Sequence, residues 1–262
     1  MITRRKFLPV AGYATMGAVT VPSFLTHCSN GEPPLPEKPV IQAKPKQNCC
    51  FVFQGDSVTE AGRRDGLELG TGYVFHISSR LMADFPQSDF VIYNRGKGGD
   101  MLGDILWRWD SDTLALKPDV LSILIGINHT IAGAEDLGAP VSGFENGYRQ
   151  MLDITLEKFP DTVFILGLPF IMPVGSHKDD WKRISEDISK RIDIIKRLAN
   201  EYNAVCIDYP ALFEKVNDIK PYEYWVADGV HPTIAGHELM AREWMKAASD
   251  RLPYLKKHCE CI

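Results

Sequence analysis

Residues 49–59 read CCFVFQGDSVT and join an unbroken apolar run to a polar turn. The run 49–54 shows no alternation of polar and apolar residues, which is typical of a strand buried on both faces of a sheet. Gly55 permits a tight backbone after the strand, and Ser57 in that turn would present its hydroxyl to a cleft. Because Gly-Asp-Ser is also a common turn sequence, this segment needs support from the rest of the chain.

Further apolar runs, alternating with longer helical patterns, predict the remaining strands. These runs are 90–94, 120–125, 162–168 and, more weakly, 204–207. The clearest helical pattern begins near Trp181, where apolar residues recur at steps of three and four. A last helix is expected after Thr233, which can act as its N-cap. Strand–helix alternation predicts an α/β fold with a mainly parallel sheet of about five strands, covered by helices on both sides.

In sheets of this kind the reactive site lies beyond the carboxyl ends of the strands. The glycine-rich loop 94–100 follows the second predicted strand and can bring backbone N–H groups close to a ligand. The Walker and dinucleotide patterns are absent, which argues against a phosphate cradle. A plain strand–helix turn is the other interpretation of this loop.

Two more polar segments occupy comparable positions. Asn128 follows the third strand and can donate a side-chain N–H into the cleft, although a turn or capping role is equally compatible with its position. Asp228 and His231 lie three residues apart on one turn. The carboxylate can fix the imidazole tautomer and leave the other ring nitrogen free as a base.

Taken in order, these four segments resemble the conserved blocks of the SGNH/GDSL hydrolase family (GDSL-like lipase/acylhydrolase). The resemblance implies a flavodoxin-like three-layer α/β/α sandwich and a serine esterase that needs no metal or organic cofactor. It assigns Ser57 as nucleophile, His231 as general base and Asp228 as the acid that orients it. The implied oxyanion hole consists of the backbone N–H groups of Ser57 and Gly96 and the side chain of Asn128.

One position departs from the family pattern, although the resemblance covers residues 50–245. The third block commonly reads Gly-x-Asn-Asp, whereas His129 follows Asn128 here. We expect His129 to support the site from behind or to face solvent. An influence on pH dependence or on substrate choice is the alternative.

The N-terminus predicts an export signal over residues 1–27. Thr3-Arg4-Arg5-Lys6-Phe7-Leu8 resembles a bacterial twin-arginine signal, and the apolar stretch 10–21 is too short to span a bilayer. A disordered tail or a short membrane anchor is the alternative. Leu25-Thr26-His27-Cys28 resembles a lipoprotein cleavage box, which would tether the protein to a membrane through a lipid on Cys28; a cleaved signal without lipid is equally compatible.

The rest of the chain divides into a linker and one domain. Residues 28–47 are rich in proline and predict an extended linker, and residues 48–262 form the hydrolase domain. The protein is expected to leave the bacterial cytoplasm and to be periplasmic or lipid-anchored at the cell envelope.

Composition excludes several other classes of partner. The net charge of -5 provides no basic surplus for nucleic acid. The six cysteines have no zinc-binding spacing, and Cys49, Cys50 and Cys206 are expected to be small buried residues in strands. The oligomeric state is left open.

The substrate is the least determined property. A short-chain or carbohydrate O-acetyl esterase is the first interpretation, and a lysophospholipase or short-chain lipid esterase is the second. A non-catalytic surface protein that binds carbohydrate, or a metal-dependent hydrolase using His231 and His237, are further alternatives. Five aromatic residues near the predicted site could stack on sugar rings or belong to the core: Trp107, Trp109, Tyr222, Tyr224 and Trp225.

Overall fold

The computed structural model describes residues 44–132 and 141–258, and a five-stranded parallel sheet lies at the centre of this part. The strand order is β2-β1-β3-β4-β5, and each neighbouring pair is parallel. The strands are β1 Cys50–Gly55, β2 Val91–Asn94, β3 Val120–Leu124, β4 Val163–Gly167 and β5 Val205–Ile207. Every predicted strand is therefore confirmed to within one residue at each end.

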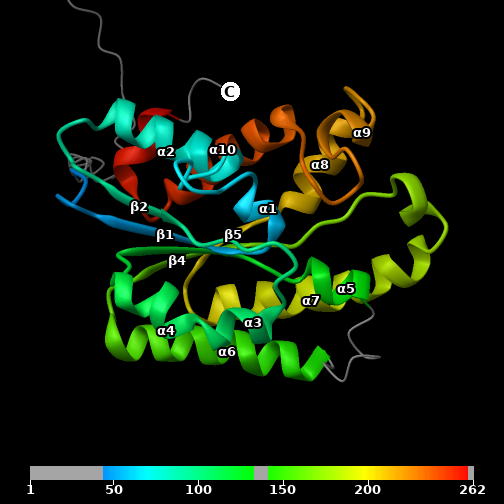
Figure 1. Cartoon of the computed structure of the whole chain (residues 1–262), viewed down its shortest axis with the longest axis horizontal. Helices are drawn as coiled ribbons and strands as arrows, with labels where there is room; N and C mark the ends of the chain where they lie inside the picture. Colours follow the sequence, from blue (N-terminus) through cyan, green and yellow to red (C-terminus); the bar gives the residue numbers. More distant parts are fainter. Residues whose placement is uncertain (1–43, 133–140, 259–262) are drawn as a thin grey trace, which may run out of the picture. The chain divides into compact units, whose positions relative to one another are not determined.

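Helices connect and cover these strands (Figure 1). They are α1 Ser57–Glu60, α2 Tyr73–Asp84, α3 Leu102–Trp107, α4 Trp109–Asp112, η1 Leu114–Leu116, α5 Ile127–Ala132, α6 Val141–Lys158, η2 Gly175–Lys178, α7 Trp181–Glu201, α8 Tyr209–Asn217, α9 Tyr222–Trp225, α10 Ile234–Ala248 and η3 Pro253–His258. Two sequence predictions are confirmed here: α7 begins at Trp181, and the Thr233 hydroxyl caps α10 by accepting a hydrogen bond from the Gly236 N–H at 3.2 Å.

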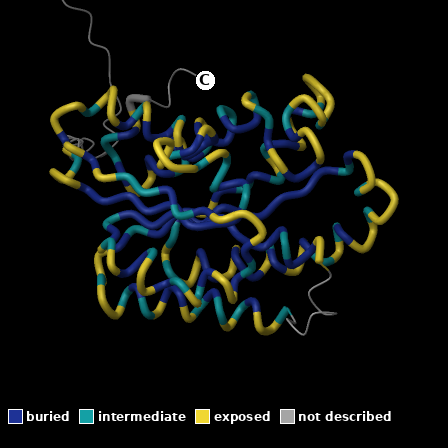
Figure 2. Tube along the Cα trace, viewed as in Figure 1, coloured by how far each residue is buried: buried dark blue, intermediate teal, exposed yellow. Residues whose placement is uncertain are grey.

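Side chains of β1 alternate between two separate hydrophobic cores. Phe51 and Phe53 belong to the core shared with α2, α8 and α10, whereas Cys50 and Val52 belong to the core shared with α3, α6 and α7. Both faces of the sheet are therefore buried under helices, as the colouring of Figure 2 shows. The absence of polar alternation in the strand sequences follows from this arrangement, and the three-layer α/β/α class is confirmed.

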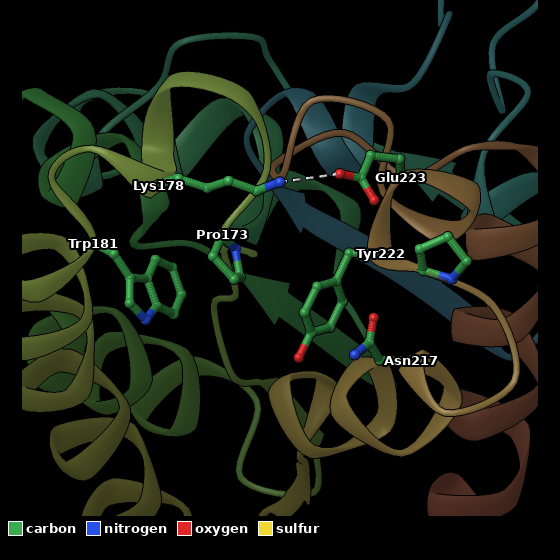
Figure 3. Close-up of a pocket in the computed structure, with 7 residues that line it drawn as sticks. Pro173, Lys178, Trp181, Asn217, Tyr222 and Glu223 are labelled. Carbon is green, nitrogen blue, oxygen red and sulfur yellow. Dashed lines mark hydrogen bonds and ion pairs between the residues drawn. The ribbon is translucent and has the colours of Figure 1, made fainter.

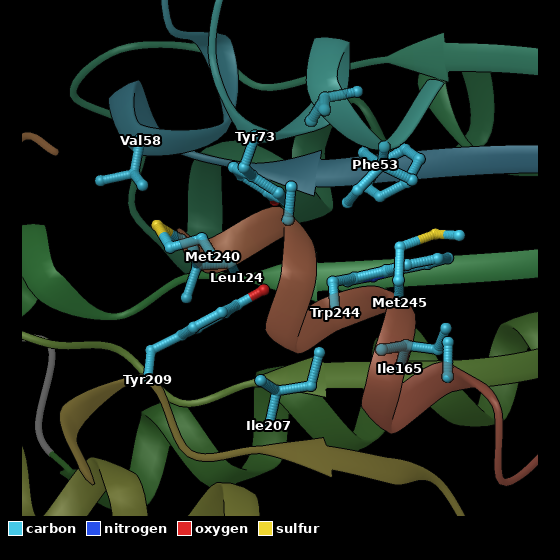
Figure 4. Close-up of a cluster of buried hydrophobic side chains, with 14 of the residues drawn as sticks. Phe53, Val58, Tyr73, Leu124, Ile165, Ile207, Tyr209, Met240, Trp244 and Met245 are labelled. Carbon is cyan, nitrogen blue, oxygen red and sulfur yellow. The ribbon is translucent and has the colours of Figure 1, made fainter. Parts of the chain in front are cut away.

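Trp244 is the central side chain of the first core (Figure 4). It is fully buried, its ring lies against Phe51 and Phe53, and its Nε1–H donates to Ser122 Oγ at 3.0 Å. Burying an aromatic side chain of this kind contributes about 2–3 kcal/mol. Because α10 follows the His231 loop directly in the chain, this packing also fixes where that loop ends.

The two edge strands correct one expectation. Residues of β2 are largely exposed or half-buried, and the middle residue of β5, Cys206, is exposed rather than buried. An edge strand has only one neighbour, and the helices cover it incompletely. Cys50 begins the inner strand β1 and Cys49 directly precedes it, and both are buried, as predicted.

The predicted export signal, residues 1–27, and most of the linker 28–47 lie outside the described residues. Within the described part, none of the helices combines the length and the apolar character that a membrane crossing requires.

Candidate active site

Ser57 lies at the carboxyl end of β1, in the first position of the short helix α1. A Cβ atom at Gly55 would come within 2.4 Å of the Leu124 carbonyl oxygen and 2.3 Å of Thr59 Oγ1, so only glycine allows this close approach. The carboxylate of Asp56 caps the turn by accepting a hydrogen bond from the Val58 N–H at 3.1 Å. Ser57 therefore lies beyond the end of the strand and is half-exposed.

Ser57, His231 and Asp228 form one continuous hydrogen-bonded chain. Ser57 Oγ is 2.9 Å from His231 Nε2, and His231 Nδ1 is 2.7 Å from Asp228 Oδ2. The structure therefore brings together the three residues that the resemblance assigns to nucleophile, base and orienting acid. An Nδ1–H donated to Asp228 leaves Nε2 free to accept the serine proton.

Asp228 is held as a carboxylate by its surroundings. Its second oxygen, Oδ1, accepts hydrogen bonds from the backbone N–H groups of Val230 at 2.9 Å and His231 at 2.7 Å. Partial burial alone would raise the pKa of Asp228, but the hydrogen bonds from the His231 ring and from these two N–H groups outweigh it. The pKa of Asp228 is lowered to about 2, so the residue orients the imidazole without sharing its proton at neutral pH.

The loop that carries Asp228 and His231 is fixed at its centre by Gly229. This residue has φ +92°, and a Cβ atom there would lie 2.6 Å from the Met172 carbonyl oxygen. The Gly229 carbonyl accepts a hydrogen bond from the Met172 N–H at 2.8 Å. The connection after β4 and the Asp228–His231 loop are therefore in direct contact.

The structure does not support the predicted donor role of Gly96. The Gly96 N–H already donates to Asn94 Oδ1 at 3.0 Å, and a Cβ at Gly96 would lie 2.3 Å from the Glu60 backbone nitrogen. This glycine is required for close packing against α1. Gly99 is the alternative donor in this loop, because its N–H has no hydrogen-bond partner in the described part of the chain. Gly99 has φ +82° and directly follows Gly98. A Cβ atom placed on Gly98 would lie 3.8 Å from Ser57 Cβ, so the loop is close to the nucleophile.

The other two predicted oxyanion donors each retain an N–H without a partner among the described residues. The Ser57 N–H is the first of its helical turn and has no partner among the described residues. Asn128 donates one of its two Nδ2 hydrogens to the Asp100 carbonyl at 2.9 Å, which fixes the side chain and leaves the second hydrogen for another acceptor. We therefore propose Ser57, Gly99 and Asn128 as the oxyanion donors.

Three contacts that the sequence did not reveal join the nucleophile turn to the glycine loop. Glu60 Oε2 accepts from the Gly98 N–H at 2.8 Å, and Arg63 donates to the Gly96 carbonyl at 2.7 Å. Asn94 Nδ2 donates to the Thr59 carbonyl at 2.8 Å. The nucleophile and the loop of backbone donors are thus held as one unit.

His129 is a buried supporting residue and does not face solvent. Its Nε2 accepts a hydrogen bond from the Leu102 N–H at 3.3 Å, and its ring lies edge-on to Phe144. Burial, with a smaller effect from Arg191, lowers the pKa of His129 to about 4. The neutral ring therefore joins α5, which carries Asn128, to the start of α3.

Asp56 is a second carboxyl group at the site whose environment the sequence did not indicate. It is almost fully buried, and burial raises its pKa to about 7, against the opposing effects of the Val58 N–H and of His231. The pKa values of Asp56 and Asp228, which both interact electrostatically with His231, are therefore shifted in opposite directions.

The hydrogen-bonded chain of Ser57, His231 and Asp228 does not include His237 or the predicted aromatic residues. His237 accepts from the Tyr73 N–H through Nδ1 at 3.2 Å, so that nitrogen is not free to pair with His231 as a metal ligand. The described residues contain no group of three or more His, Cys, Asp or Glu side chains suited to a metal ion. Trp109 belongs to the core, Trp225 bonds to backbone carbonyls, and Trp107 is 92% exposed.

Similar sequences exist among known proteins. The model of the GDSL-like lipase/acylhydrolase family matches residues 53–239. The acetylxylan esterase of Geobacillus stearothermophilus is 30% identical over 208 residues, which cover 75% of this chain and 92% of that protein.

Solved structures extend the comparison. The structure of the Geobacillus esterase covers 77% of this chain and 94% of its own, with a TM-score of 0.68 and 28% identity. A Parabacteroides merdae protein described as a GDSL-like lipase reaches a TM-score of 0.72 and 34% identity, covering 78% of this chain and 97% of its own. Catalytic variants of the Geobacillus esterase replace a serine, an aspartate or a histidine by alanine.

Replacing Glu60 tests whether the contact with the glycine loop positions the oxyanion donors. We expect Glu60→Ala to lower kcat about tenfold or more with little change in KM, because small displacements of catalytic groups are costly. Glu60→Gln keeps an oxygen acceptor for the Gly98 N–H and should recover most of the loss. Steady-state kinetics on p-nitrophenyl acetate would measure both, and equal activity of the alanine variant and the wild type would contradict this role.

Replacing His129 tests the pH dependence of stability. Between about pH 6.5, its ordinary pKa, and about pH 4, its pKa in the fold, the unfolded chain binds the extra proton. The free energy of unfolding should therefore fall as the pH drops through this window, by up to ~1.4 kcal/mol per pH unit for this one group. Urea denaturation of His129→Gln at pH 7 and pH 5 should show a smaller fall than wild type. An identical fall in both proteins would contradict the assignment.

Proposed function

This chain belongs to the GDSL-like lipase/acylhydrolase family and is a carboxylic ester hydrolase, and we propose that it removes O-acetyl groups from a carbohydrate polymer through an acyl-enzyme on Ser57. The observation that carries the proposal is the Ser57–His231–Asp228 chain, with distances of 2.9 and 2.7 Å. The acetylxylan esterase relative supports an acetylated xylan as the first substrate to test.

The first half-reaction follows from this geometry. Ser57 Oγ attacks the ester carbonyl carbon, and the Ser57 proton moves to His231 Nε2. The carbonyl π electron pair moves onto the carbonyl oxygen, which becomes the oxyanion. The N–H groups of Ser57, Gly99 and Asn128 stabilise that charge. The bond from the carbonyl carbon to the alcohol oxygen then breaks as the carbonyl re-forms, and His231 gives the proton to the departing sugar oxygen, which leaves as a hydroxyl.

The second half-reaction repeats these steps with water. Water gives a proton to His231 and attacks the acetyl carbonyl carbon of the acyl-enzyme. The Ser57 Oγ–carbon bond breaks, Ser57 regains its proton and acetate leaves. Throughout, the ionised Asp228 stabilises the imidazolium form of His231.

Hydrolysis of a matched series of esters tests this function. We expect turnover of acetylated xylan and of p-nitrophenyl acetate, weaker turnover of the butyrate, and least turnover of the octanoate. Ser57→Ala should remove nearly all activity, and Asn128→Ala should lower kcat by roughly 10²–10³ because one oxyanion donor is lost. A preference for octanoate would favour the lipid esterase alternative, and well-folded protein inactive on every ester would favour a binding role.

We also propose that the protein is exported and reaches the cell envelope. The paired Arg4 and Arg5 ahead of an apolar stretch support this, and Cys28 is the proposed lipid attachment site. Fractionation of a bacterial host expressing the full chain should find the wild type outside the cytoplasm. An Arg4→Lys, Arg5→Lys double variant should stay inside, because a twin-arginine pathway reads the arginine pair. Equal distribution of both proteins would contradict this route.

A further inference from the structure

A shallow groove lies beside the catalytic loop and has no part in the steps above. It has an open volume of about 460 Å³ and is lined by Pro173, Lys178, Trp181, Asn217, Pro221, Tyr222 and Glu223. Figure 3 shows the rings of Trp181 and Tyr222 on either side of Pro173, with the Lys178–Glu223 ion pair across the opening. A second hollow of about 370 Å³ shares Pro173, Trp181 and Tyr222 and continues the groove along α7. We call this the Trp181–Tyr222 groove.

The groove combines flat apolar faces with free polar groups. Pro173, Trp181 and Tyr222 are only half-buried, so their rings are accessible. Within the described residues, neither the Asn217 amide nor the Tyr222 hydroxyl has a hydrogen-bond partner. Lys178 and Glu223 are exposed and only 3.5 Å apart, an ion pair of little stability that can be exchanged for contacts with a ligand.

Both walls of the groove are attached to the loop that carries Asp228 and His231. Met172, the residue before Pro173, donates its N–H to the Gly229 carbonyl at 2.8 Å. On the other wall, the Val226 N–H donates to the Tyr222 carbonyl at 2.7 Å, two residues before Asp228. The groove therefore lies at the carboxyl edge of the sheet, as Ser57 does, and this is the edge where α/β proteins bind ligands.

We propose that the Trp181–Tyr222 groove binds the sugar backbone of a polysaccharide whose acetyl ester lies at Ser57. This proposal rests on the proposed function, because the polymer is taken to be the esterase substrate. A pyranose ring has an apolar face that stacks on aromatic rings and a rim of hydroxyls that needs hydrogen-bond partners. The half-exposed rings of Trp181 and Tyr222 provide the first, and Asn217 and the Lys178–Glu223 pair provide the second.

The groove fits an acyl chain less well than a sugar chain. Asn217 and the Lys178–Glu223 pair lie among its apolar rings, and an alkyl chain offers these polar groups no hydrogen bonds, whereas sugar hydroxyls do. It is also open rather than enclosed, which suits a long chain that extends beyond the site at both ends.

Kinetics on substrates of different length tests the proposal. We expect Trp181→Ala and Tyr222→Ala to lower kcat/KM for acetylated xylohexaose about tenfold, mainly through KM, because one stacking contact is lost. For p-nitrophenyl acetate, which is too small to reach the groove, kcat/KM should stay within about twofold. Tyr224→Ala is the matched control, since this exposed tyrosine lies on the same helix and does not line the groove.

Activity on p-nitrophenyl acetate also reports on folding. This control is needed because Trp181 packs partly against a buried cluster that includes Ile127 and Val230, and its removal can disturb the fold. Should Trp181→Ala lose activity on both substrates, Tyr222→Ala and Asn217→Ala, which lie outside that cluster, decide the matter. Unchanged hexaose kinetics in both of these would overturn the proposal. Selective loss of p-nitrophenyl octanoate turnover in place of hexaose turnover would also overturn it, and would place an acyl chain in the groove.

Binding without turnover separates this proposal from the proposed function. Calorimetric titration of the Ser57→Ala protein with unacetylated xylohexaose needs no ester chemistry. We expect binding that weakens about tenfold when Trp181→Ala or Tyr222→Ala is added. Such binding would support the groove even if the wild type failed on every acetyl ester, and absence of binding would overturn the groove even if the enzyme were active.

Discussion

The register of the parallel sheet is the constraint from which the site follows. Gly55 lies opposite Leu124, and Leu124 lies opposite Gly167, so β1, β3 and β4 end at the same level. The segments that leave these strands must diverge from one edge. Ser57, Asn128 and the connection leading to Met172 become neighbours for this reason, although none is adjacent to another in sequence. A shift of register by one residue would exchange the faces of a strand and displace its loop, so the two hydrophobic cores stabilise the site geometry as well as the fold.

Two carboxyl groups near the histidine show how the fold separates chemical roles. Asp228 is partly exposed and accepts hydrogen bonds on both oxygens, which keeps it ionised. Asp56 lies under the nucleophile turn, where burial disfavours its charge. A carboxylate with a lowered pKa can orient and stabilise the imidazole throughout the reaction. A buried carboxyl that caps the turn instead shapes the backbone from which Ser57 projects.

Sequence alone predicted the strands and the triad, but only part of the oxyanion hole. Unbroken apolar runs define strands buried on both faces, and polar residues after each run mark the reactive edge. The loop 96–99 was harder, because three of its four residues are glycine and any of them permits a close approach. Which N–H is free depends on Asn94, which engages Gly96 across the loop. The exposure of Cys206, the contact from Glu60 and the groove between Trp181 and Tyr222 likewise depend on neighbours distant in sequence.

The hydrogen bond between Ser57 and His231 joins residues 174 positions apart. Closing a loop of this length costs conformational entropy, and the packing of α10 on α2, which holds the His231 loop at the edge of the sheet, offsets that cost. The serine is made early in synthesis but has no base until the C-terminal segment has folded. Reactivity is thereby delayed until the whole domain is assembled, and a partly synthesised or truncated chain carries an unactivated alcohol.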